Sequence, residues 1–492
     1  MENPNFRFKD GNELLSSHSG TALVGLLLPR INLAQRLSAV ELSGSPNPII
    51  SHVDIVTAMI GLLTIGKCHY DDIEQFREDP FFKKSLNLSH VPSSPTIRQR
   101  LDDAGSSFNT ILKEESVYLL QTLGRLSSIN VGEYSYIPLD LDVTPMDNSN
   151  TKKEGVSYTY KGFDGYAPMM AYIGKEGYLV NLELRPGKQH SQSGTPSFLR
   201  ETLQFARTIT NETVLVRMDS GNDAADNIKI FTEENFSFII KRNLRRESKE
   251  KWRNIAMEQG SKISLGGGRT RWIGKTERFI EGLEKPVSII FDLVEKTQGP
   301  KGQMLITPDI EVETYWTNID NLSAVQKIVL DESTGELKKG SASAKNKILD
   351  QNQRLAEAII NSYHAHGESE QFHSEFKTDM GLERMPSGKF ETNTLILILG
   401  MMAYNILRLC GQESLKAIDH FTETNEPLPI NRRKGVFRRR IRSVLHDIMF
   451  LASHITVSSR YTWISFGRCS PWSGIFKWLY QHFSNPVPLV NG

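Results

Sequence analysis

The sequence predicts a mixed α/β protein, and two patterns along the chain carry this prediction. Apolar residues are spaced for short helices over about the first 130 residues, whereas from Tyr136 they alternate at a period of two, which is typical of strands. Three strand candidates are then followed by alternating helix and strand candidates, in the order βββαβαβ. A meander that continues into helix and strand alternation favours a mixed sheet covered by helices. At 492 residues the chain is long enough for about three domains.

The composition excludes several classes of protein. With 39% hydrophobic and 23% charged residues, and 58 basic against 57 acidic side chains, the chain is neither disordered, collagen-like nor a disulfide scaffold. The longest apolar run, residues 394–404, is shorter than the roughly 20 residues of a membrane span, so we expect no membrane partner. Residues 22–28 lack the basic lead and cleavage site of a signal peptide. The three cysteines lie far apart without metal or redox spacing, which favours the cytoplasm.

Residues 1–133 are expected to form a helical region. Ser51 is placed to cap one helix, and Ser93 is placed to cap a later helix that carries Arg98 and Arg100. Two capped helices with cations early in the second one fit a helix-turn-helix reader of DNA, whose recognition helix contacts DNA through its N-terminal residues. A small helical bundle with no role in DNA binding explains the pattern equally well.

Residues 134–244 contain the βββαβαβ pattern itself. The strand candidates are residues 136–143, 165–173, 177–184, 213–218 and 236–241, and the helix candidates are residues 196–208 and 223–234. Residues 245–347 are rich in Gly, Lys and Glu, with strand-like runs at 287–293 and 310–316, so we expect a mainly β insertion or, alternatively, a separate linked domain. The pattern turns helical again from Ile348, which opens the last part of the α/β domain, residues 348–412.

Acidic residues follow two of the strand candidates. Asp140 and Asp142 project from the same face of the first strand, because side chains alternate along a strand. A buried carboxylate needs a partner, and a metal ion is a common one. Asp219 ends a later strand and precedes Ser220-Gly221, a turn that exposes the strand end. Taken singly, Asp142 and Asp219 also fit ordinary turn residues.

A helix expected over residues 361–377 presents a polar stripe. The stripe consists of residues three or four positions apart, namely Tyr363, His366, Glu370, His373 and Lys377. A neighbouring stripe, Ala365, Ser369, Phe372 and Phe376, is suited to pack on the sheet. An ordinary exposed polar face is the alternative. A zinc site at His364, His366 and His373 is disfavoured because residues two apart on a helix point in different directions.

Together these residues resemble the DDE triad of transposases with a ribonuclease H-like core. The resemblance rests on Asp142-Val143-Thr144, on Asp219-Ser220-Gly221 and on Glu370. Tyr363, His366, Glu370 and Lys377 are in register with the YREK signature of bacterial insertion-sequence transposases, and the match is closest to the insertion-sequence family numbered thirteen-eighty, related to family four. Arg185-Pro186-Gly187, residues 385–393 and residues 403–407 extend the similarity from about residue 50 to the C-terminus. His366 departs from the pattern, which usually has Arg at this position. A neutral imidazole holds a phosphate less firmly than a guanidinium does.

The resemblance implies a fold and a metal site. The fold is a ribonuclease H-like mixed sheet interrupted by the β insertion, with a helical N-terminal DNA-binding region and a basic helical C-terminal region over residues 413–492. The site is two Mg²⁺ ions, replaceable by Mn²⁺, held by Asp142, Asp219 and Glu370, with Tyr363, His366 and Lys377 near the scissile phosphate. Asp140 is a rival for the first position, and whether it shares the metal stays open. Glu368 is a weaker rival for Glu370.

The implied activity is cut-and-paste transposition in the bacterial cytoplasm, in association with the nucleoid. The enzyme cleaves the ends of a DNA element and transfers the 3′ ends to target DNA, and its partners are the double-stranded terminal inverted repeats, the target DNA and a second copy of the chain in a synaptic dimer. Arg98 and Arg100 are expected at the repeats, and a basic cluster over residues 432–442, which includes Arg438, Arg439 and Arg440, is expected on phosphates or else on a solvated helix face. Trp252, Trp272 and Trp316 are candidates to stack on a flipped base, although ordinary core positions are favoured.

Two other functions compete with this one. The first is a domesticated, sequence-specific DNA-binding regulator without catalysis, and the intact set of Asp, Asp and Glu argues against it. The second is a metal-dependent nuclease that cuts without joining, which only a strand-transfer assay separates from a transposase.

Overall fold

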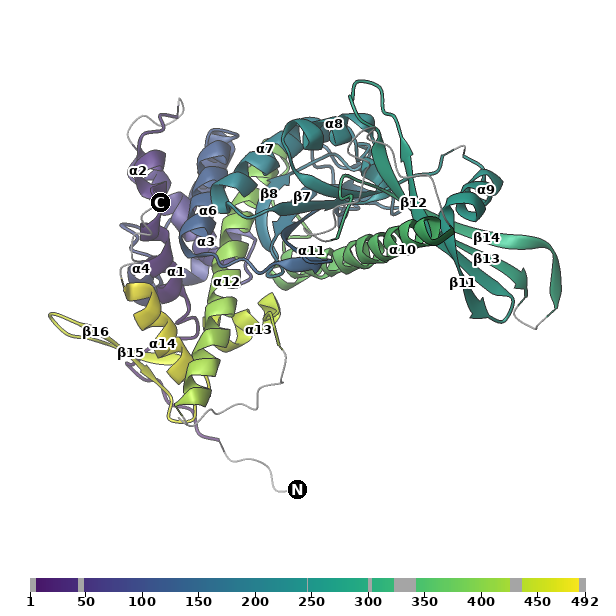
Figure 1. The fold of residues 1–492 in the computed structure, drawn as a ribbon. Helices are drawn as coiled ribbons and strands as arrows, with labels where there is room; N and C mark the ends of the chain where they lie inside the picture. The colour runs from purple at the N-terminus through teal and green to yellow at the C-terminus, as the bar shows by residue number, and fades with distance from the viewer. Residues whose placement is uncertain are drawn as a thin grey trace. The chain divides into compact units, whose positions relative to one another are not determined.

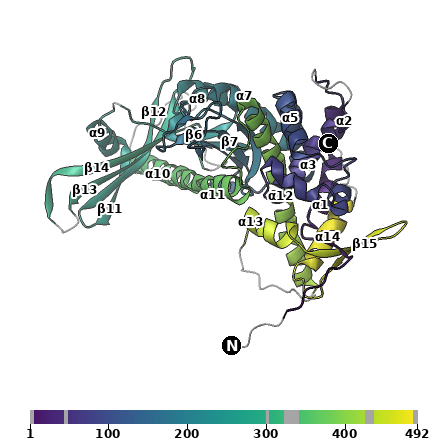
Figure 2. The same ribbon diagram turned by 180° about the vertical axis from the view of Figure 1, so that it is seen from behind.

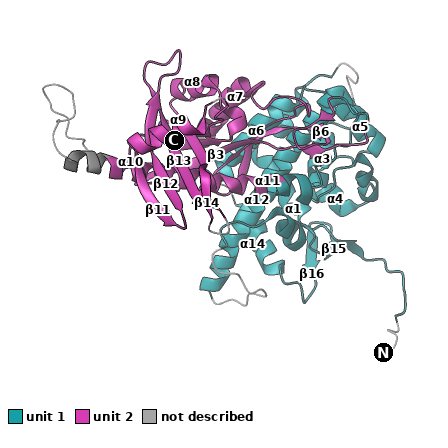
Figure 3. Ribbon diagram, turned by 90° about the vertical axis from the view of Figure 1, so that its right-hand side faces the viewer, with its two compact units in different colours: residues 1–124, 152–154, 374–492 teal, residues 125–151, 155–373 magenta. Residues whose placement is uncertain are grey.

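The computed structural model describes residues 6–42, 48–245, 247–299, 303–322, 342–424 and 436–485, with backbone alone for residues 342–348. These residues fall into two compact units (Figure 3). Unit 1 combines residues 1–124, 152–154 and 374–492, whereas unit 2 combines residues 125–151 and 155–373. The N-terminal and C-terminal helical segments, predicted as separate regions, therefore share one unit. The predicted last part of the α/β domain divides between the two units after His373.

A large mixed sheet forms the centre of unit 2 (Figure 1). Its strands are β2 (Ile129–Val131), β3 (Tyr134–Val143), β7 (Met169–Ile173), β8 (Tyr178–Glu183), β9 (Val214–Met218), β10 (Ser237–Lys241), β11 (Gly260–Gly266), β12 (Arg269–Arg278), β13 (Val287–Gln298) and β14 (Met304–Thr317). The order is β11-β12-β13-β14-β10-β9-β3-β7-β8, with β2 paired to β3. Strand β3 is parallel to β9, and β9 is parallel to β10, while β7 is antiparallel to both β3 and β8. The predicted mixed sheet is confirmed.

One predicted strand, residues 165–173, is divided in two. Its first residues form β6 (Asp164–Tyr166), which lies in a separate small sheet with β4 (Met146–Asp147) and β5 (Ser157–Tyr158) in the order β4-β6-β5. The break falls at Ala167-Pro168, where proline has no N–H to donate to a ladder. The hairpin of β5 and β6, with its connecting turn, is therefore not part of the large sheet.

The predicted β insertion continues the large sheet. Strand β14 pairs with both β13 and β10, so β11 to β14 extend the sheet at its β10 side. Figures 1 and 2 show these four strands together with α9 (Lys249–Gln259) at one end of unit 2. Phe291 of β13 contacts Trp252 of α9, whereas the next residue back, Ile290, belongs to the core beneath α10 (Ala342–His364). Because side chains alternate along a strand, α9 and α10 cover opposite faces of this part of the sheet.

The remaining helices of unit 2 differ from prediction in one place. Helices α7 (Thr195–Ile209) and α8 (Ala225–Glu233) match the prediction, but the single α-helix predicted over residues 361–377 is wrong. Instead α10 ends at His364, a 3₁₀ segment covers Ala365–Glu368, α11 covers Ser369–Ser374 and a π-helical turn covers Glu375–Asp379. Two features explain the break. Gly367 has a low helix propensity. In addition, Arg217 Nη1 donates a hydrogen bond of 2.6 Å to the Ser362 carbonyl, an acceptor that a regular α-helix would use for its own backbone hydrogen bond.

Unit 1 is mostly helical. Its α-helices are α1 (Thr21–Leu27), α2 (Leu33–Ser38), α3 (His52–Leu63), α4 (Pro80–Ser85), α5 (Ser94–Ala104), α6 (Asn109–Leu123), α12 (Phe390–Glu423), α13 (Ile441–Val444) and α14 (Ser473–Ser484). Ser51 and Ser93 cap α3 and α5 as predicted, accepting hydrogen bonds from the backbone of Asp54 and Thr96. The C-terminal region is not purely helical, because β15 (Ser453–Val457) and β16 (Thr462–Phe466) form a hairpin that pairs with β1 (Leu14–Ser16).

Helix α12 is the long apolar helix of unit 1. By length and composition alone it meets the criterion for a membrane span, but 94% of its most apolar 18-residue window is buried inside the protein. It also carries Arg408, whose guanidinium is fully buried and paired with Glu375 and with the hydroxyl of Tyr404. These features are those of a core helix.

Candidate active site

Two acids meet at the carboxyl ends of neighbouring parallel strands. Leu141 of β3 pairs with Met218 of β9, so Asp142 and Asp219 are the next residues on the two strands. This end of a parallel pair is the usual place for a site in an α/β sheet. Burial raises the pKa of Asp219, and the negative charge of Asp142 raises it further. The two carboxylates are therefore close enough to repel each other.

Each of these carboxylates is held by one oxygen. Asp142 Oδ1 accepts a hydrogen bond of 2.7 Å from the Val143 backbone, and Asp219 Oδ1 accepts hydrogen bonds from the Gly221 backbone at 3.1 Å and from Asn222 Nδ2 at 2.8 Å. Among the described residues, no hydrogen bond reaches Oδ2 of either acid. One oxygen of each carboxylate is thus fixed by the local turn. Oδ2 of Asp219 is left for a ligand, whereas Oδ2 of Asp142 lies 3.6 Å from His373 Nε2.

Asp140, the rival for the first position, is already paired. Arg217 grips it with two hydrogen bonds, Nε to Oδ1 at 2.6 Å and Nη2 to Oδ2 at 2.7 Å, and both side chains are 4% exposed. Burial by itself would raise the pKa of Asp140, but the charges of Arg217 and His366 outweigh it and lower the pKa. With both oxygens engaged, Asp140 serves as the counter-charge of a buried arginine.

His366 does not lie where the sequence predicts a phosphate contact. Its Nδ1 is 3.0 Å from Asp140 Oδ1, and its side chain is 9% exposed. Burial would lower the pKa of His366, but Asp140 outweighs this effect and raises it. The His366 imidazole therefore points into the protein and pairs with Asp140. The larger, planar guanidinium of the usual Arg would pair with a carboxylate in a different geometry.

Glu370 lies on α11 between two histidines that contact the first strand. His366 faces Asp140, while His373 Nε2 is 3.6 Å from Asp142 Oδ2 and its Nδ1 is 3.3 Å from the Tyr172 hydroxyl. Burial would raise the pKa of Asp142, but His373 lowers it. Glu370 is exposed on this stretch. In the described part of the chain, no group of three or more His, Cys, Asp or Glu side chains is close enough to hold a metal ion.

The two remaining residues of the signature have different surroundings. Tyr363 is half-buried against Tyr315, with ring centroids 4.9 Å apart, and its pKa is raised by burial and then by Asp219 and Asp142. Its ring centroid is also 5.8 Å from that of His366, the partner of Asp140. Lys377 lies in the π-helical turn Glu375–Asp379, which belongs to unit 1.

Two residues at the site escaped the sequence analysis. Tyr160, in the turn between β5 and β6, donates a hydrogen bond of 3.2 Å from its hydroxyl to the Val143 carbonyl. Burial raises the pKa of Tyr160 to about 12, with the charges of Asp142 and Asp219 as further causes. No spacing in the sequence marks this tyrosine. Arg217 did carry a signal, because a cation inside an apolar strand requires a buried partner.

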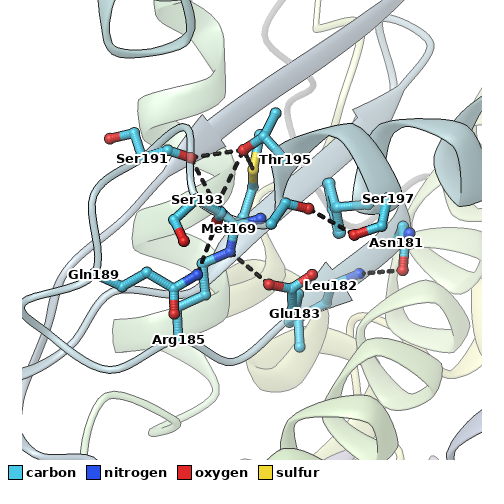
Figure 4. A network of polar contacts seen from close by, with 12 residues as sticks. Met169, Asn181, Leu182, Glu183, Arg185, Gln189, Ser191, Ser193, Thr195 and Ser197 are labelled. Carbon is cyan, nitrogen blue, oxygen red and sulfur yellow. Dashed lines mark hydrogen bonds and ion pairs between the residues drawn. The ribbon is translucent and has the colours of Figure 1, made fainter. Parts of the chain in front are cut away.

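The Arg185-Pro186-Gly187 motif begins a loop that Arg185 holds through polar contacts (Figure 4). Arg185 is 1% exposed, and its guanidinium donates hydrogen bonds to Glu183 Oε1 at 2.6 Å and to the Ser191 carbonyl at 2.9 Å. The same carbonyl accepts a hydrogen bond from Thr195 Oγ1 at the start of α7. A Cβ added to Gly221 would lie 3.1 Å from Ser191 Oγ, so this loop packs against the turn that follows Asp219.

The arginines predicted to contact DNA through α5 differ in exposure. Arg98 is exposed and lies 5.9 Å from the Tyr70 ring. Arg100 is 7% exposed, and its Nη2 is 2.5 Å from His52 Nδ1. Arg100 is therefore a packing residue in this structure, and the prediction that it contacts DNA directly is not supported.

The C-terminal basic cluster is likewise partly structural. Residues 432–434 lie outside the described residues. Arg439 is 7% exposed and pairs with Asp447, while Arg440 binds Asp379 through Nε at 2.7 Å. Arg438 is half-buried. The predicted solvated or phosphate-binding run thus contains at least one arginine, Arg439, that is committed to the fold.

The tryptophans follow the favoured interpretation as core residues. Trp252 is fully buried and Trp316 is 6% exposed. Trp272 is partly buried, with Lys262 Nζ 5.4 Å from its ring centroid.

Comparison with known proteins gives one family model and several distant structures, among them two transposase complexes. The family model described as "Transposase DDE domain group 1" matches residues 3–270. No curated protein sequence matches the chain. A piggyBac transposase synaptic complex with hairpin DNA is 11% identical, with 97% of this chain and 87% of that chain covered and a TM-score of 0.37. A Drosophila P element transposase strand transfer complex is also 11% identical, with 93% and 97% covered and a TM-score of 0.20.

With TM-scores this low, neither structure adds an argument about this chain. The family model, by contrast, covers more than half of the 492 residues and includes both Asp142 and Asp219. The chain therefore belongs to the transposase DDE domain group 1 family.

Proposed function

We propose that this protein is the transposase of a bacterial insertion sequence of the family numbered thirteen-eighty. It binds the terminal inverted repeats of its element, cleaves the DNA ends by metal-dependent phosphodiester hydrolysis and transfers the 3′ ends to target DNA. The observation that carries the proposal is that Asp142 and Asp219 directly follow the last paired residues of β3 and β9, Leu141 and Met218, in a chain of the DDE family.

The strand order supports a ribonuclease H-like core. In chain order the strands β3, β7, β8, β9 and β10 are the first to fifth of the predicted core, and they lie in the sheet as β10-β9-β3-β7-β8. The second of them, β7, is antiparallel to its neighbours, whereas β3, β9 and β10 run parallel. A meander joined to a parallel half through helices α7 and α8 is the arrangement that the resemblance implies.

The acids fit a hard divalent cation. Asp142 and Asp219 repel each other, and each leaves one oxygen without a hydrogen bond, so a cation between them would remove an electrostatic cost. We propose two Mg²⁺ ions, replaceable by Mn²⁺, with Glu370 as the third ligand from its exposed position on α11. Bound there, such ions would lower the pKa of the attacking water or 3′-hydroxyl and stabilise the leaving oxygen.

The protein's own side chains would hold this site in place. The Asp140–Arg217 pair joins β3 to β9 just before the two acids, and Arg217 also bonds to the Ser362 carbonyl near the end of α10. His373 restrains Asp142 from α11. Tyr363 and Lys377 would position the phosphate, and Arg98, Arg438 and Arg440 would contact the DNA backbone in a synaptic homodimer in the nucleoid-associated cytoplasm.

The test is a cleavage and joining assay with the full chain. The substrate is a labelled duplex that contains the DNA flanking the protein's own gene, with Mg²⁺ or Mn²⁺ and a target plasmid. Wild type should make metal-dependent cuts at the repeat boundary and join the 3′ ends, whereas Asp142→Ala, Asp219→Ala and Glu370→Ala should bind the ends without cutting. Asp226→Ala, an exposed acid on α8, is the control for the two aspartates, and Glu258→Ala, an exposed acid on α9, is the control for Glu370.

Other outcomes would change the assignment. Binding without cleavage in either metal would favour a regulator, and cleavage without joining would favour a nuclease. Cutting that survives one of the three substitutions would remove that residue from the triad.

A further inference from the structure

The turn between β5 and β6 presents two side chains beside the acid pair. We propose that Tyr160 and Lys161 bind the DNA strand next to the scissile phosphate, with the Tyr160 ring stacked on a nucleobase and Lys161 paired with a backbone phosphate. This inference rests on the proposed function and adds a substrate contact to the same site.

Tyr160 is hydrogen-bonded to the residue that follows Asp142. Its hydroxyl donates to the carbonyl of Val143, the residue directly after Asp142, at 3.2 Å. The effect of Asp142 and Asp219 on the Tyr160 pKa agrees with this placement. The side chain is nevertheless 65% exposed, because only the hydroxyl end is enclosed. An aromatic ring therefore faces solvent within reach of whatever the two carboxylates act on.

Hydrogen bonds close the turn that carries Tyr160 and Lys161. The Phe163 carbonyl accepts hydrogen bonds from both the backbone N–H and the Oγ1 of Thr159, each at 2.8 Å. Gly162 adopts a φ of 88°, which L side chains rarely reach. A ring held by a closed turn loses little conformational freedom when it binds a strand.

The Arg185-Pro186-Gly187 loop supports this turn from behind. Tyr166 of β6 forms a bridge with Pro186, and the Lys188 backbone donates to Ser157 Oγ at 3.0 Å. A Cβ added to Gly187 would lie 2.1 Å from the Ser157 carbonyl oxygen, so only glycine permits this approach. The motif thus braces the turn on one side while Arg185 anchors the loop beside Asp219 on the other.

Charge indicates the kind of partner. Lys161 Nζ lies 5.6 Å from the Tyr160 ring centroid, and Lys161 is exposed. An exposed aromatic ring with a cation over one of its faces matches single-stranded nucleic acid, where rings stack on bases of any sequence and lysines neutralise phosphates. The cation also offsets the repulsion that Asp142 and Asp219 exert on an approaching phosphate.

The experiment uses the full chain and element-end duplexes in two readouts. The first is equilibrium binding to duplexes with 2-aminopurine at single positions on either side of the cut, followed by fluorescence. The second is single-turnover cleavage of duplexes with one abasic site at each of those positions. The variants are Tyr160→Ala, Tyr160→Phe and Lys161→Gln. Tyr158→Ala is the matched control, since Tyr158 is in the same hairpin and is 67% exposed.

The expected pattern is specific to stacking. Tyr160→Ala should slow cleavage by about 5-fold to 150-fold, the range that one base–aromatic stack supplies, and Tyr160→Phe should lose less because it keeps the ring. One abasic position should slow wild type by a similar factor and should not slow Tyr160→Ala further. The 2-aminopurine signal at that position should be lost in Tyr160→Ala and kept in Tyr158→Ala. Lys161→Gln should lower the salt slope of binding by about 0.9.

Contrary results are separable from failure of the proposed function. Equal abasic effects in wild type and Tyr160→Ala, or a 2-aminopurine signal that Tyr160→Ala keeps, would overturn the inference. A change in dimerisation without either effect would overturn it in favour of a contact between protein chains. If wild type makes no cuts, the proposed function fails, and the fluorescence arm still decides whether Tyr160 stacks on DNA.

Discussion

Carboxylates in the two units have opposite surroundings. In unit 1, Glu375 is fully buried and is paired with the equally buried Arg408 of α12. In unit 2, the partly buried Asp142 and Asp219 lie next to each other at the ends of two inner strands, and the nearby guanidinium of Arg217 is bonded to Asp140. An acid that receives an arginine stabilises the fold, whereas an acid left with another acid is available for a cation. The surroundings, and not the residue type, separate the two roles.

The largest effect is expected when the charge of Asp219, which lies next to Asp142, is removed. Asp219→Asn should reduce cleavage by more than about 1,000-fold, because a neutral amide no longer supports the divalent ions of a phosphoryl-transfer site. The melting temperature without metal should stay constant or rise, because the repulsion from Asp142 disappears. Mg²⁺ should raise the melting temperature of wild type and leave that of the variant unchanged. A clear loss of stability in Asp219→Asn would place this acid with the structural ones.

The next effect breaks the paired acid of unit 1. Arg408→Leu leaves Glu375 buried without its cation and also removes a donor to Tyr404 and to the Arg439 carbonyl. We expect a loss of about 3–5 kcal/mol in the free energy of unfolding, measured by urea denaturation. Arg200→Gln, which breaks an exposed ion pair with Glu233, is the control and should change little. A loss no larger than that of the control would contradict the comparison.

Arg217 combines a structural role with a role at the site, because it pairs with the buried Asp140 and also bonds to the Ser362 carbonyl. Arg217→Met should destabilise the fold by about 3 kcal/mol, because it leaves the buried Asp140 with His366 as its one remaining charged partner among the described residues. The double variant Asp140→Leu/Arg217→Met should regain most of that stability, since a well-packed apolar pair often replaces a buried ion pair. Cleavage should stay low in the double variant, because the hydrogen bond to the Ser362 carbonyl is still missing. Recovery of both properties would show that the pair acts on stability alone.

The smallest effect concerns a carboxylate that two arginines share. Glu247 accepts hydrogen bonds from Arg242 at 2.9 Å and from Arg278 at 2.6 Å, and although burial opposes them, they lower the Glu247 pKa to about 2. A depressed folded-state pKa contributes stability above the unfolded value of about 4.3, and this contribution is lost as the pH falls toward 2. Glu247→Gln should therefore flatten the fall of melting temperature between pH 5 and about pH 2. An unchanged slope would mean that other acids cause the fall.

The sequence predicted the core elements of unit 2 for a simple physical reason. Apolar periodicity sets β3, β7, β8, β9 and β10 and the helices α7 and α8, and local hydrogen bonding sets the caps at Ser51 and Ser93. Strands β2, β11 and β12 of the large sheet were not predicted. Such signals act over a few residues. The helix over residues 361–377 was predicted as continuous and is not, because its break involves Arg217 from a strand almost 150 positions earlier.

The candidate site was predicted in part. Asp142 and Asp219 were predicted to act together through the resemblance to the DDE triad, and the register of β3 and β9 places them next to each other. Arg100 and Arg439 were predicted on the surface and are buried, because spacing shows that arginines cluster but not which of them finds an internal partner. Tyr160 was missed because a tyrosine in a turn has no periodic signal.

The sequence by itself determined the strand and helix pattern, the two acids at strand ends and the signature on the late helix. Tertiary structure alone decided which of the neighbouring acids is neutralised. Asp140 and Asp142 are two residues apart on one face of β3, yet register places Arg217 opposite Asp140 and brings Asp219 beside Asp142. Electrostatic energy depends on distances between residues remote in the chain, and only the folded sheet sets those distances.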